Sequence, residues 1–285
     1  MGSLDGKVAF ITGAARGMGQ SHAVTLAREG ADIVMVDISE NIGSVPYDLA
    51  TAEQLEQSRA EVEALDRRVI AANADVRSQA QLDAVVAQAV DEFGGIDICI
   101  ANAGIWSVAP YWEMSEEQWQ EMIDVDLSGV WRTAKAATPS MIERGGGAIV
   151  LISSVNGLEP NTNFAHYTSA KSGVIGLMKA IAFEGGPHNI RCNAICPGVV
   201  DTPMNDWQGA YDLFAGKPGG TREDRYYGAM HWSILKGRGV LPRSAVSNAI
   251  LWMVADTGAD VTGLVVPIDG GHGILPGFNP EPVRS

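Results

Sequence analysis

Two polar side chains with complementary chemistry stand one helical turn apart in the segment NFAHYTSAKSGV, residues 163–174. Tyr167 and Lys171 follow an i, i+4 spacing, which brings side chains together on one face of a helix. A phenol has a reference pKa of about 10 and becomes useful near neutral pH only when a neighbouring cation stabilises its anion. The pair is therefore either a proton-transfer device or a solvated helix face.

A glycine-rich turn with the sequence ITGAARGMG joins the first apolar run to the first helical pattern. Gly13, Gly17 and Gly19 allow a sharp turn whose backbone approaches a pyrophosphate at a helix N-terminus. Asp37 ends the next apolar run, where a carboxylate accepts the hydroxyls of an adenosine ribose and repels a 2′-phosphate, so the pattern favours NAD over NADP. Arg16 leaves open the alternative of a 2′-phosphate partner. The residues expected around this part of the nucleotide are Gly13, Arg16, Gly17, Met18, Gly19, Asp37 and Ile38.

Two further apolar runs also end in polar or small residues. NADV places Asp75 at the end of the third run, in position to hold an adenine amino group, with Val76 beside it. ANAG places Asn102, Ala103 and Gly104 at the end of the fourth run, against the nucleotide. Asp75 could instead cap the next helix and Gly104 could simply turn the chain, and both roles are compatible with binding.

Apolar runs typical of buried strands alternate with helical patterns along the chain. Strands are expected at residues 7–13, 31–37, 67–76, 96–104, 147–155, 190–198 and 264–269, and helices at 18–30, 79–94, 115–145, about 167–183 and 243–256. This alternation requires crossover connections and a parallel sheet covered by helices on both faces. The sequence therefore predicts an α/β fold with a single doubly wound parallel sheet of the Rossmann type, as one domain over residues 1–285.

Three stretches are longer than the usual connections of such a fold. They are an insertion at about residues 38–58, a segment rich in aromatic residues at about 201–235, and a C-terminal tail at about 273–285. Long loops at the carboxyl ends of strands are where these sheets bind ligands. The first two stretches are therefore predicted to be lids.

The charge and cysteine content exclude other classes of function. The net charge of −14 repels phosphate backbones and anionic membranes, so neither nucleic acid nor a membrane is an expected partner. The chain begins almost directly with a strand and has no apolar segment long enough to span a bilayer. Cys99, Cys192 and Cys196 lack metal-ligand spacing, and Cys99 and Cys192 fit buried thiols in a reducing compartment. A redox pair of Cys192 and Cys196 is an alternative that their place at a strand end, and not at a helix start, disfavours. A cytoplasmic protein without a metal site is predicted.

The motifs TGAARGMG, NAG, ISS, YTSAK and PG, in this order, resemble those of the short-chain dehydrogenase/reductase family over about residues 5–273. The resemblance implies that Ser154, Tyr167 and Lys171 are catalytic. Tyr167 would exchange a proton with the substrate oxygen while a hydride moves between the carbinol carbon and the nicotinamide. Lys171, helped by the positive charge of the nicotinamide, would stabilise the phenolate and lower its pKa, and it would also bind the nicotinamide ribose. Ser154 would donate a hydrogen bond to the substrate oxygen.

One position departs from the family pattern. The family often has an asparagine in a vNl.G motif of the long helix, whereas this chain reads VDLSG and places Asp126 there. A carboxylate lacks the amide donor and adds a negative charge near Lys171. We expect this charge to raise the pKa of Lys171, weaken the stabilisation of the phenolate and shift the activity optimum to higher pH. The alternative is that the backbone of a locally distorted helix acts there and the side chain matters little.

A finer resemblance lies in FITGAARGMGQSHAVTLAREGADIVMVDI and the following SVPYDLATAEQLEQ, which are similar to the carveol dehydrogenase subfamily, also called mycofactocin-coupled dehydrogenases. In that group the insertion folds over NAD, which is thought not to exchange freely, and electrons pass to a separate redox carrier. Val45, Pro46 and Tyr47 would form an apolar flap. An ordinary surface excursion is the alternative.

The loop after the sixth strand, PGVVDTPM, resembles the family segment whose backbone meets the nicotinamide carboxamide. Large apolar rings concentrate in the segment that follows, which suits a hydrophobic alcohol or ketone such as a cyclic terpenoid. For any single ring, packing within the lid or at a subunit interface is the more common role. We expect the nicotinamide site at Pro197, Gly198, Val200 and Thr202, and the substrate site at Ser154, Tyr167, Trp106, Leu158, Asn161, Met204 and Trp207.

The resemblance thus implies an NAD-dependent dehydrogenase that interconverts a secondary, apolar alcohol and its ketone, and a homotetramer, since family members are commonly tetramers. A biosynthetic carbonyl or 3-oxoacyl reductase is an alternative that Asp37 disfavours, because such reductases generally use NADPH. A nucleotide-sensing module without chemistry is the second alternative. The intact Ser154, Tyr167 and Lys171 disfavour it.

Overall fold

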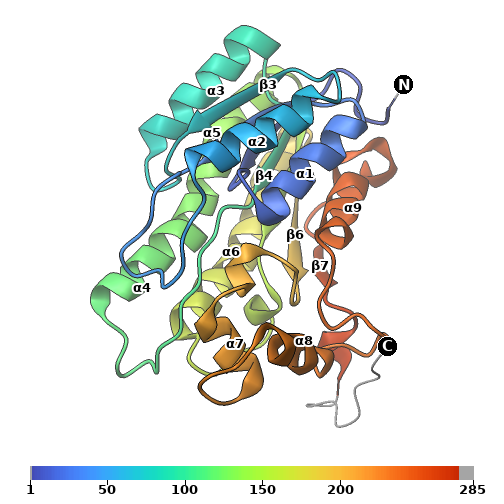
Figure 1. Cartoon of the computed structure of the whole chain (residues 1–285). Coiled ribbons are helices and arrows are strands. Elements are labelled where there is room, and N and C mark those ends of the chain that lie inside the picture. The colour runs from blue at the N-terminus through green and yellow to red at the C-terminus, as the bar shows by residue number, and fades with distance from the viewer. Residues whose placement is uncertain (1, 276–285) are drawn as a thin grey trace.

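The strands of the computed structural model, which describes residues 2–275, form one parallel sheet (Figure 1). They are β1 (Val8–Thr12), β2 (Asp32–Asp37), β3 (Val69–Asn73), β4 (Ile98–Ala101), β5 (Gly147–Ile152), β6 (Ile190–Pro197) and β7 (Val265–Ile268). Their order is β3-β2-β1-β4-β5-β6-β7, and every pairing between neighbours is parallel. The predicted fold class is confirmed.

Helices cover both faces of the sheet. They are α1 (Gly17–Arg28), α2 (Ala52–Glu63), α3 (Gln79–Phe93), α4 (Glu116–Ile123), α5 (Val130–Glu143), α6 (Ala165–Gly185), α7 (Gln208–Ala215), α8 (Arg222–Met230) and α9 (Arg243–Val254). Successive strand residues point to opposite faces, so Val8 and Phe10 belong to one buried cluster and Ala9 and Ile11 to another. The first cluster is completed by α3, α5 and α6, and the second by α1, α2 and α9.

The stretch expected as one helix over residues 115–145 is divided. A π-helical segment, Asp124–Gly129, separates α4 from α5. Such segments inside helices frequently occur at functional sites. The side chain of Asp126 in this segment is fully buried, and the segment packs against α6. The distorted backbone that sequence analysis offered as an alternative is therefore present together with a buried carboxylate.

The long connections contain structure of their own. α2 begins at Ala52 behind a capping box formed by Thr51 and Gln54, so the irregular part of the insertion spans residues 38–51. The aromatic-rich segment after β6 contains α7 and α8, which pack on each other. Residues 276–285, most of the predicted tail, lie outside the described residues. Between residues 2 and 275, no helix combines the length and the apolar character needed to cross a membrane.

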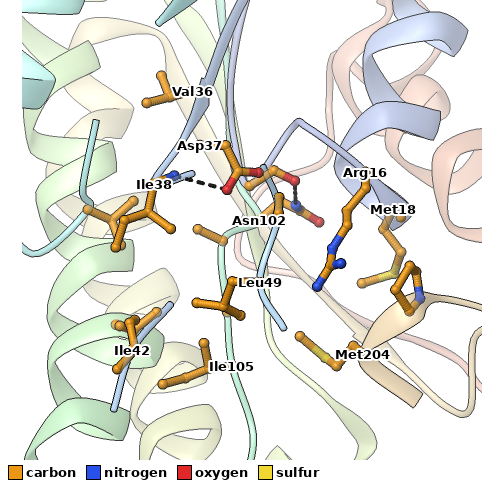
Figure 2. A pocket seen from close by; sticks show the side chains of 18 of the residues that line it. Arg16, Met18, Val36, Asp37, Ile38, Ile42, Leu49, Asn102, Ile105 and Met204 are labelled. Atoms are coloured by element: carbon orange, nitrogen blue, oxygen red, sulfur yellow. Dashed lines mark hydrogen bonds between the residues drawn. The ribbon is translucent and has the colours of Figure 1, made fainter. Parts of the chain in front are cut away.

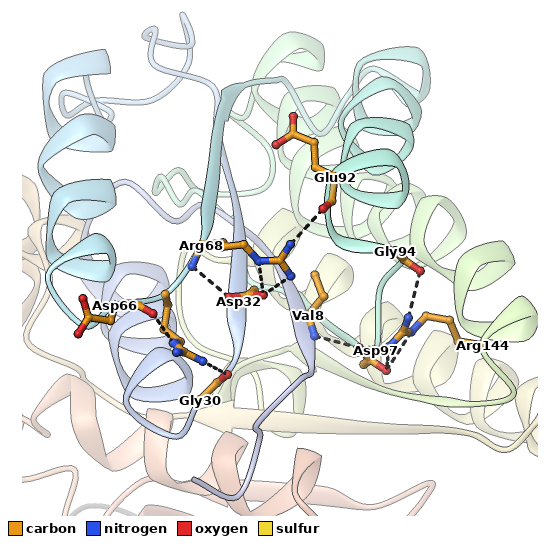
Figure 3. Close-up of polar contacts among 10 residues, drawn as sticks. Val8, Gly30, Asp32, Asp66, Arg68, Glu92, Gly94, Asp97 and Arg144 are labelled. Carbon is orange, nitrogen blue, oxygen red and sulfur yellow. Dashed lines mark hydrogen bonds and ion pairs between the residues drawn. The ribbon is translucent and has the colours of Figure 1, made fainter. Parts of the chain in front are cut away.

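Carboxylates and arginines hold the edge of the sheet at which the strands begin (Figure 3). Asp97 accepts hydrogen bonds from the Val8 amide at 2.9 Å and from the Arg144 guanidinium at 3.0 Å. Asp32 accepts from the Arg68 amide at 3.0 Å and from the guanidinium of the same residue. At the opposite edge, the strand order reverses between β1 and β4, which is the switch point where doubly wound sheets bind ligands.

Candidate active site

The turn between β1 and α1 requires glycine for its own packing. Gly13 and Gly17 adopt φ values of +66° and +63°, in the left-handed region that favours glycine. A side chain at Gly19 would place its Cβ 2.1 Å from the Gly13 carbonyl oxygen. The N-cap residue Arg16 makes no side-chain cap, which leaves the first amides of α1 available to an anion.

Asp37 ends β2 beside this turn, and backbone amides hold its carboxylate. The two oxygens accept hydrogen bonds from the amides of Ala15 at 3.0 Å and of Ile38 at 2.9 Å. Burial raises the pKa of Asp37, and the two amides and Arg16 act in the opposite direction. Each oxygen keeps a further lone pair, which fits the acceptance of hydrogen bonds from hydroxyl groups.

Arg16 extends across the cavity beside Asp37 (Figure 2) and donates a hydrogen bond to the Asp48 carbonyl of the insertion. Burial lowers the pKa of Arg16, while Tyr47, Asp37 and Asp48 act to raise it. The guanidinium is thus engaged by the insertion and by the negative charge of Asp37. This disfavours the alternative in which Arg16 meets a 2′-phosphate.

Asp75 and Asn102 both have structural partners. Asp75 accepts hydrogen bonds from the Arg77 amide and side chain, at 2.8 Å each, so it holds the turn before α3. The Asn102 side chain donates to the carbonyls of Thr12 at 2.9 Å and Gly13 at 3.1 Å, which fixes the glycine-rich turn. Both residues also line the cavity beside this turn, so the structural and binding roles coexist.

One cavity, which we call the nucleotide cavity, brings most of the predicted cofactor residues together. Those that line it are Gly13, Arg16, Gly17, Met18, Asp37, Ile38, Asp75, Val76, Asn102, Ala103, Gly104 and Thr202. Gly19 does not line it and serves the turn behind it. The insertion contributes Tyr47, Ala50, and the residues Ile42 and Leu49 labelled in Figure 2. Of these only Tyr47 was predicted, although the apolar residues of the insertion were an available signal.

The residues predicted to exchange a proton meet where α6 passes the ends of β4 and β5. Lys171 Nζ donates to the Ile152 carbonyl at 3.0 Å. The Tyr167 ring centroid lies 5.6 Å from Lys171 Nζ. Ser154 precedes the short 3-10 turn Val155–Gly157 as its N-cap, and its hydroxyl oxygen accepts the Asn156 amide at 3.1 Å. Folding therefore collects side chains from two separate segments at one point.

Asp126 contacts Lys171 directly. Its Oδ2 lies 3.0 Å from Lys171 Nζ, and its Oδ1 accepts the Ile105 amide at 2.8 Å. Burial raises the pKa of Asp126, which Lys171 and the Ile105 amide oppose. Burial acts to lower the pKa of Lys171, but Asp126 and Tyr167 outweigh it and the pKa is raised. This is the direction that sequence analysis expected for Lys171.

The protein's own groups raise the pKa of Tyr167 above its ordinary value. Burial is the main cause and Asp126 adds to it, whereas Lys171 and Ser154 act to lower the pKa without outweighing these effects. Lys171 alone therefore does not bring the phenol into the neutral range. The resemblance implies that the positive charge of an oxidised nicotinamide would act with Lys171 to lower this pKa.

A second cavity of about 570 Å³, which we call the substrate cavity, extends from these residues toward α7 and α8. Its lining includes the predicted residues Ser154, Tyr167, Lys171, Asp126, Trp106, Asn161, Met204, Pro197, Gly198, Val200 and Thr202. Phe214, Tyr227 and Trp232 supply rings from the aromatic-rich segment, as its composition indicated. Phe164 lines the cavity too and was missed, although it lies just before Tyr167 in the sequence.

Two residues predicted to contact substrate do not line this cavity. Leu158, the C-cap of the 3-10 turn, is 49% exposed, whereas Val155 and Asn156 within the turn are buried. Trp207 packs between Tyr47 and Trp106, with ring centroids 5.6 and 5.3 Å apart. Leu158 therefore belongs to the surface, and Trp207 supports a wall residue without lining the cavity.

The insertion covers one side of the nucleotide cavity. Val45 and Tyr47 pack against the core, whereas Pro46, which was expected to join them, is exposed. The Ser44 amide donates to a carboxylate oxygen of Glu121 on α4 at 3.0 Å. These contacts favour the flap over the alternative of an ordinary surface excursion.

Comparison with known proteins agrees with this arrangement. The model of the family described as short chain dehydrogenase matches residues 7–210. The (−)-trans-carveol dehydrogenase of Rhodococcus erythropolis is 43% identical over 276 residues, which cover 95% of this chain and 99% of that protein. An uncharacterised NAD-dependent oxidoreductase of Mycobacterium tuberculosis is 42% identical over 272 residues, which cover 95% of this chain and 97% of that protein.

A solved structure is similar over nearly the whole chain. The carveol dehydrogenase of Mycobacterium avium, in complex with NAD, has a TM-score of 0.93 and 41% identity, and the match covers 96% of this chain and 100% of that one. The match therefore includes the insertion and the aromatic-rich segment as well as the sheet. This chain belongs to the short-chain dehydrogenase family.

Proposed function

We propose that this protein is an NAD-dependent dehydrogenase that interconverts a secondary, cyclic and apolar alcohol and its ketone. The observation that carries the proposal is the position of Tyr167 and Lys171 in the substrate cavity, at its junction with the nucleotide cavity. Gly104 and Met204 line both cavities, so a dinucleotide in one and an alcohol in the other would meet there.

The residues of the nucleotide cavity fit NAD. Asp37 would accept the hydroxyls of the adenosine ribose, and the uncapped amides of α1 would meet the pyrophosphate. The carveol dehydrogenase of Mycobacterium avium is an NAD complex. Bound NAD supplies the acceptor for the hydride of the alcohol. Lys171, Pro197, Gly198, Val200 and Thr202 would surround the nicotinamide end.

The side chains around Tyr167 would manage the proton. Tyr167 takes the hydroxyl proton during alcohol oxidation and returns it during ketone reduction. The Ser154 oxygen already accepts the Asn156 amide, so its own hydrogen can be donated to the substrate oxygen. Lys171 stabilises the phenolate, and Asp126 limits this effect by neutralising the ammonium charge.

The walls of the substrate cavity favour an apolar, ring-shaped substrate. Trp106, Phe164, Phe214 and Trp232 present aromatic surface around about 570 Å³. Asp224 also lines the cavity, so a carboxylate or phosphate substrate would be repelled. The named relative from Rhodococcus acts on carveol, which supports a terpenoid-like alcohol as the first candidate.

We further propose that the insertion retains NAD between turnovers and that electrons leave through a separate redox carrier such as mycofactocin. The contact between Arg16 and the Asp48 carbonyl, with Ile42 and Leu49 lining the same cavity, supports retention. Exchange of the nucleotide would require these contacts to open.

For the assembled protein we propose a cytoplasmic homotetramer with one catalytic domain in each chain. Trp131 and Ile142 on α5 and Phe183 on α6 are exposed apolar side chains that a subunit contact would bury. All three cysteines are free and buried, which fits a reducing compartment.

The first experiment is to denature the purified protein without added cofactor and quantify the nucleotide released. Near-stoichiometric NAD or NADH supports retention, and carveol oxidation is then followed with an artificial electron acceptor. An empty protein that oxidises carveol with free NAD keeps the dehydrogenase and removes retention. A protein that neither binds NAD nor oxidises carveol or other cyclic secondary alcohols contradicts the proposed function.

A further inference from the structure

Tyr47 belongs to the insertion, yet it contacts the walls of both cavities. Its ring lines the nucleotide cavity. Its hydroxyl oxygen accepts a hydrogen bond at 3.1 Å from the amide of Trp106, a residue that lines the substrate cavity. The same ring packs against Trp207, with centroids 5.6 Å apart. One side chain therefore joins the cover of the nucleotide to the segment that forms the substrate cavity.

The Met204 carbonyl makes this junction specific. It accepts hydrogen bonds from the indole N–H of Trp106 at 2.9 Å and of Trp207 at 3.1 Å. The centroids of the two indole rings are 5.3 Å apart, and Met204 itself lines both cavities. Trp106 and Trp207 both donate to the Met204 carbonyl and both contact Tyr47. A shift of either tryptophan therefore changes the position of the other.

The same group of rings reaches the proton-transfer residue. Trp106 stacks on Phe164 with ring centroids 5.4 Å apart, and the Phe164 ring meets the Tyr167 ring with centroids 5.9 Å apart. Packed aromatic side chains of this kind have few alternative arrangements, so displacement at one end is transmitted along the contacts. The row Tyr47, Trp207, Trp106, Phe164 and Tyr167 runs from the insertion to the catalytic centre.

The insertion also makes a hydrogen bond to α4 and one within itself, besides the contact of Tyr47 with Trp207. The Ser44 amide donates to Glu121 of α4, and the Leu49 amide donates to the Asn41 side chain at 2.7 Å. Burial raises the pKa of Tyr47 above its ordinary value, so its ring is a neutral packing group at all physiological pH values. Tyr47 therefore meets Trp207 as a neutral ring, and this ring contact links the insertion to the aromatic-rich segment.

We propose that Tyr47 is a positioning residue that couples nucleotide retention to the state of the substrate cavity through Trp207. The proposal rests on the proposed function only in requiring that the first cavity binds NAD. Opening the segment around Trp207 removes a packing partner of Tyr47 and loosens the insertion, and loosening the insertion disturbs Trp106. Such coupling is reciprocal, because each ligand stabilises the arrangement that the other binds.

The test measures the release rate of NADH from the holoprotein after chase with excess NAD, with no alcohol present. Trp207 does not line the nucleotide cavity, yet Trp207→Ala should speed NADH release by about fivefold or more. Trp112→Ala is the matched control, because it is the same substitution at a tryptophan that is 71% exposed, lines neither cavity and has Tyr111 as its aromatic partner. It should change release by less than about twofold.

A double-mutant cycle then isolates the contact. Tyr47→Ala should speed release as well, and Tyr47→Ala with Trp207→Ala should fall clearly short of the product of the two single effects. Tyr47→Phe keeps the ring contact and should restore release to within about twofold of the unmodified protein. Unchanged thermal unfolding of the variants shows that the effects are local.

Three results would overturn the proposal: an unchanged rate in Trp207→Ala, an equal acceleration in Trp112→Ala, or fully independent effects in the cycle. Because the assay contains no substrate, these results leave the dehydrogenase assignment intact. A protein that holds no NADH in this assay contradicts the proposed function together with the coupling.

Discussion

The two edges of the sheet each carry a pair of buried or half-buried aspartates, and the pairs are used differently. At the edge where the strands begin, Asp32 and Asp97 are contacted by the guanidinium groups of Arg68 and Arg144 (Figure 3). At the edge where the strands end, Asp37 accepts only backbone amides, and Asp126 combines one amide with Lys171.

The two pairs differ in whether their carboxylate oxygens can accept further hydrogen bonds. Carboxylates engaged by a guanidinium fork have strong, geometrically fixed partners and stabilise the fold. Burial raises the pKa of both Asp37 and Asp126, and their hydrogen-bond partners only oppose this effect. Asp37 and Asp126 are therefore available for interaction with ligands and with Lys171. Asp32 and Asp97 are not. Substitutions at the two edges should separate catalysis from stability.

The largest effect on turnover is expected for Tyr167→Phe, at the edge where the strands end. Loss of the phenol oxygen removes the proton donor and acceptor, so kcat for carveol oxidation should fall by about 1,000-fold. The ring does not line the nucleotide cavity, so bound nucleotide should stay unchanged. Steady-state kinetics and nucleotide content measure the two quantities.

The control for this substitution is Tyr111→Phe, which removes the oxygen of a tyrosine that is 72% exposed. It should leave both quantities as they are. If Tyr167→Phe keeps most of its turnover, the catalytic assignment is wrong. If the unmodified protein binds NAD but never turns over an alcohol, the nucleotide-sensing alternative gains support.

Asp37→Ala should have the next largest effect, on the cofactor and not on the chemistry. In the proposed complex Asp37 accepts the ribose hydroxyls and repels a 2′-phosphate, so removing its carboxylate should weaken NAD binding by about tenfold or more and improve NADP binding. Titration of both nucleotides measures this change. Asp32→Ala removes a carboxylate from the other edge and should leave the preference for NAD intact. Equal preference in Asp37→Ala and the unmodified protein would contradict the role of Asp37.

Asp126→Asn should move the pH–rate profile. In the proposed mechanism alcohol oxidation requires the deprotonated Tyr167, and the charge of Asp126 is one cause of its raised pKa. Removing the charge lowers that pKa, so the acidic limb of kcat/KM for oxidation should shift to lower pH by about one unit. At a fixed pH on this limb, the rate should rise by about tenfold. An unchanged profile would mean that the π-helical backbone acts without the side chain.

Sequence reasoning was most successful where a short motif has a backbone reason. Gly13, Gly17, Asp37 and the fold itself could be predicted because turns and strand ends constrain them locally. Trp207 and Leu158 were misplaced because a composition of aromatic residues gives no direction to any one side chain. The direction of Trp207 depends on Tyr47 and Trp106, which lie far from it in the sequence. Likewise, the π-helical segment at Asp126 packs against α6, a contact between segments far apart in the sequence.

The smallest effect on turnover is expected for Asp97→Asn, at the edge where the strands begin. This substitution should instead lower stability clearly. An amide in this place can accept the Val8 amide or face Arg144, but its own donors meet the guanidinium, so buried hydrogen bonds are lost. The free energy of unfolding should fall by about 2 kcal/mol, which lowers Tm by about 5 °C in a chain of this size. Differential scanning calorimetry measures this loss, and kcat for carveol should remain within about twofold. A loss of turnover without a loss of stability would mean that the two edges are not separable, because strand positions at one edge would then set the geometry of Asp37 and Asp126 at the other.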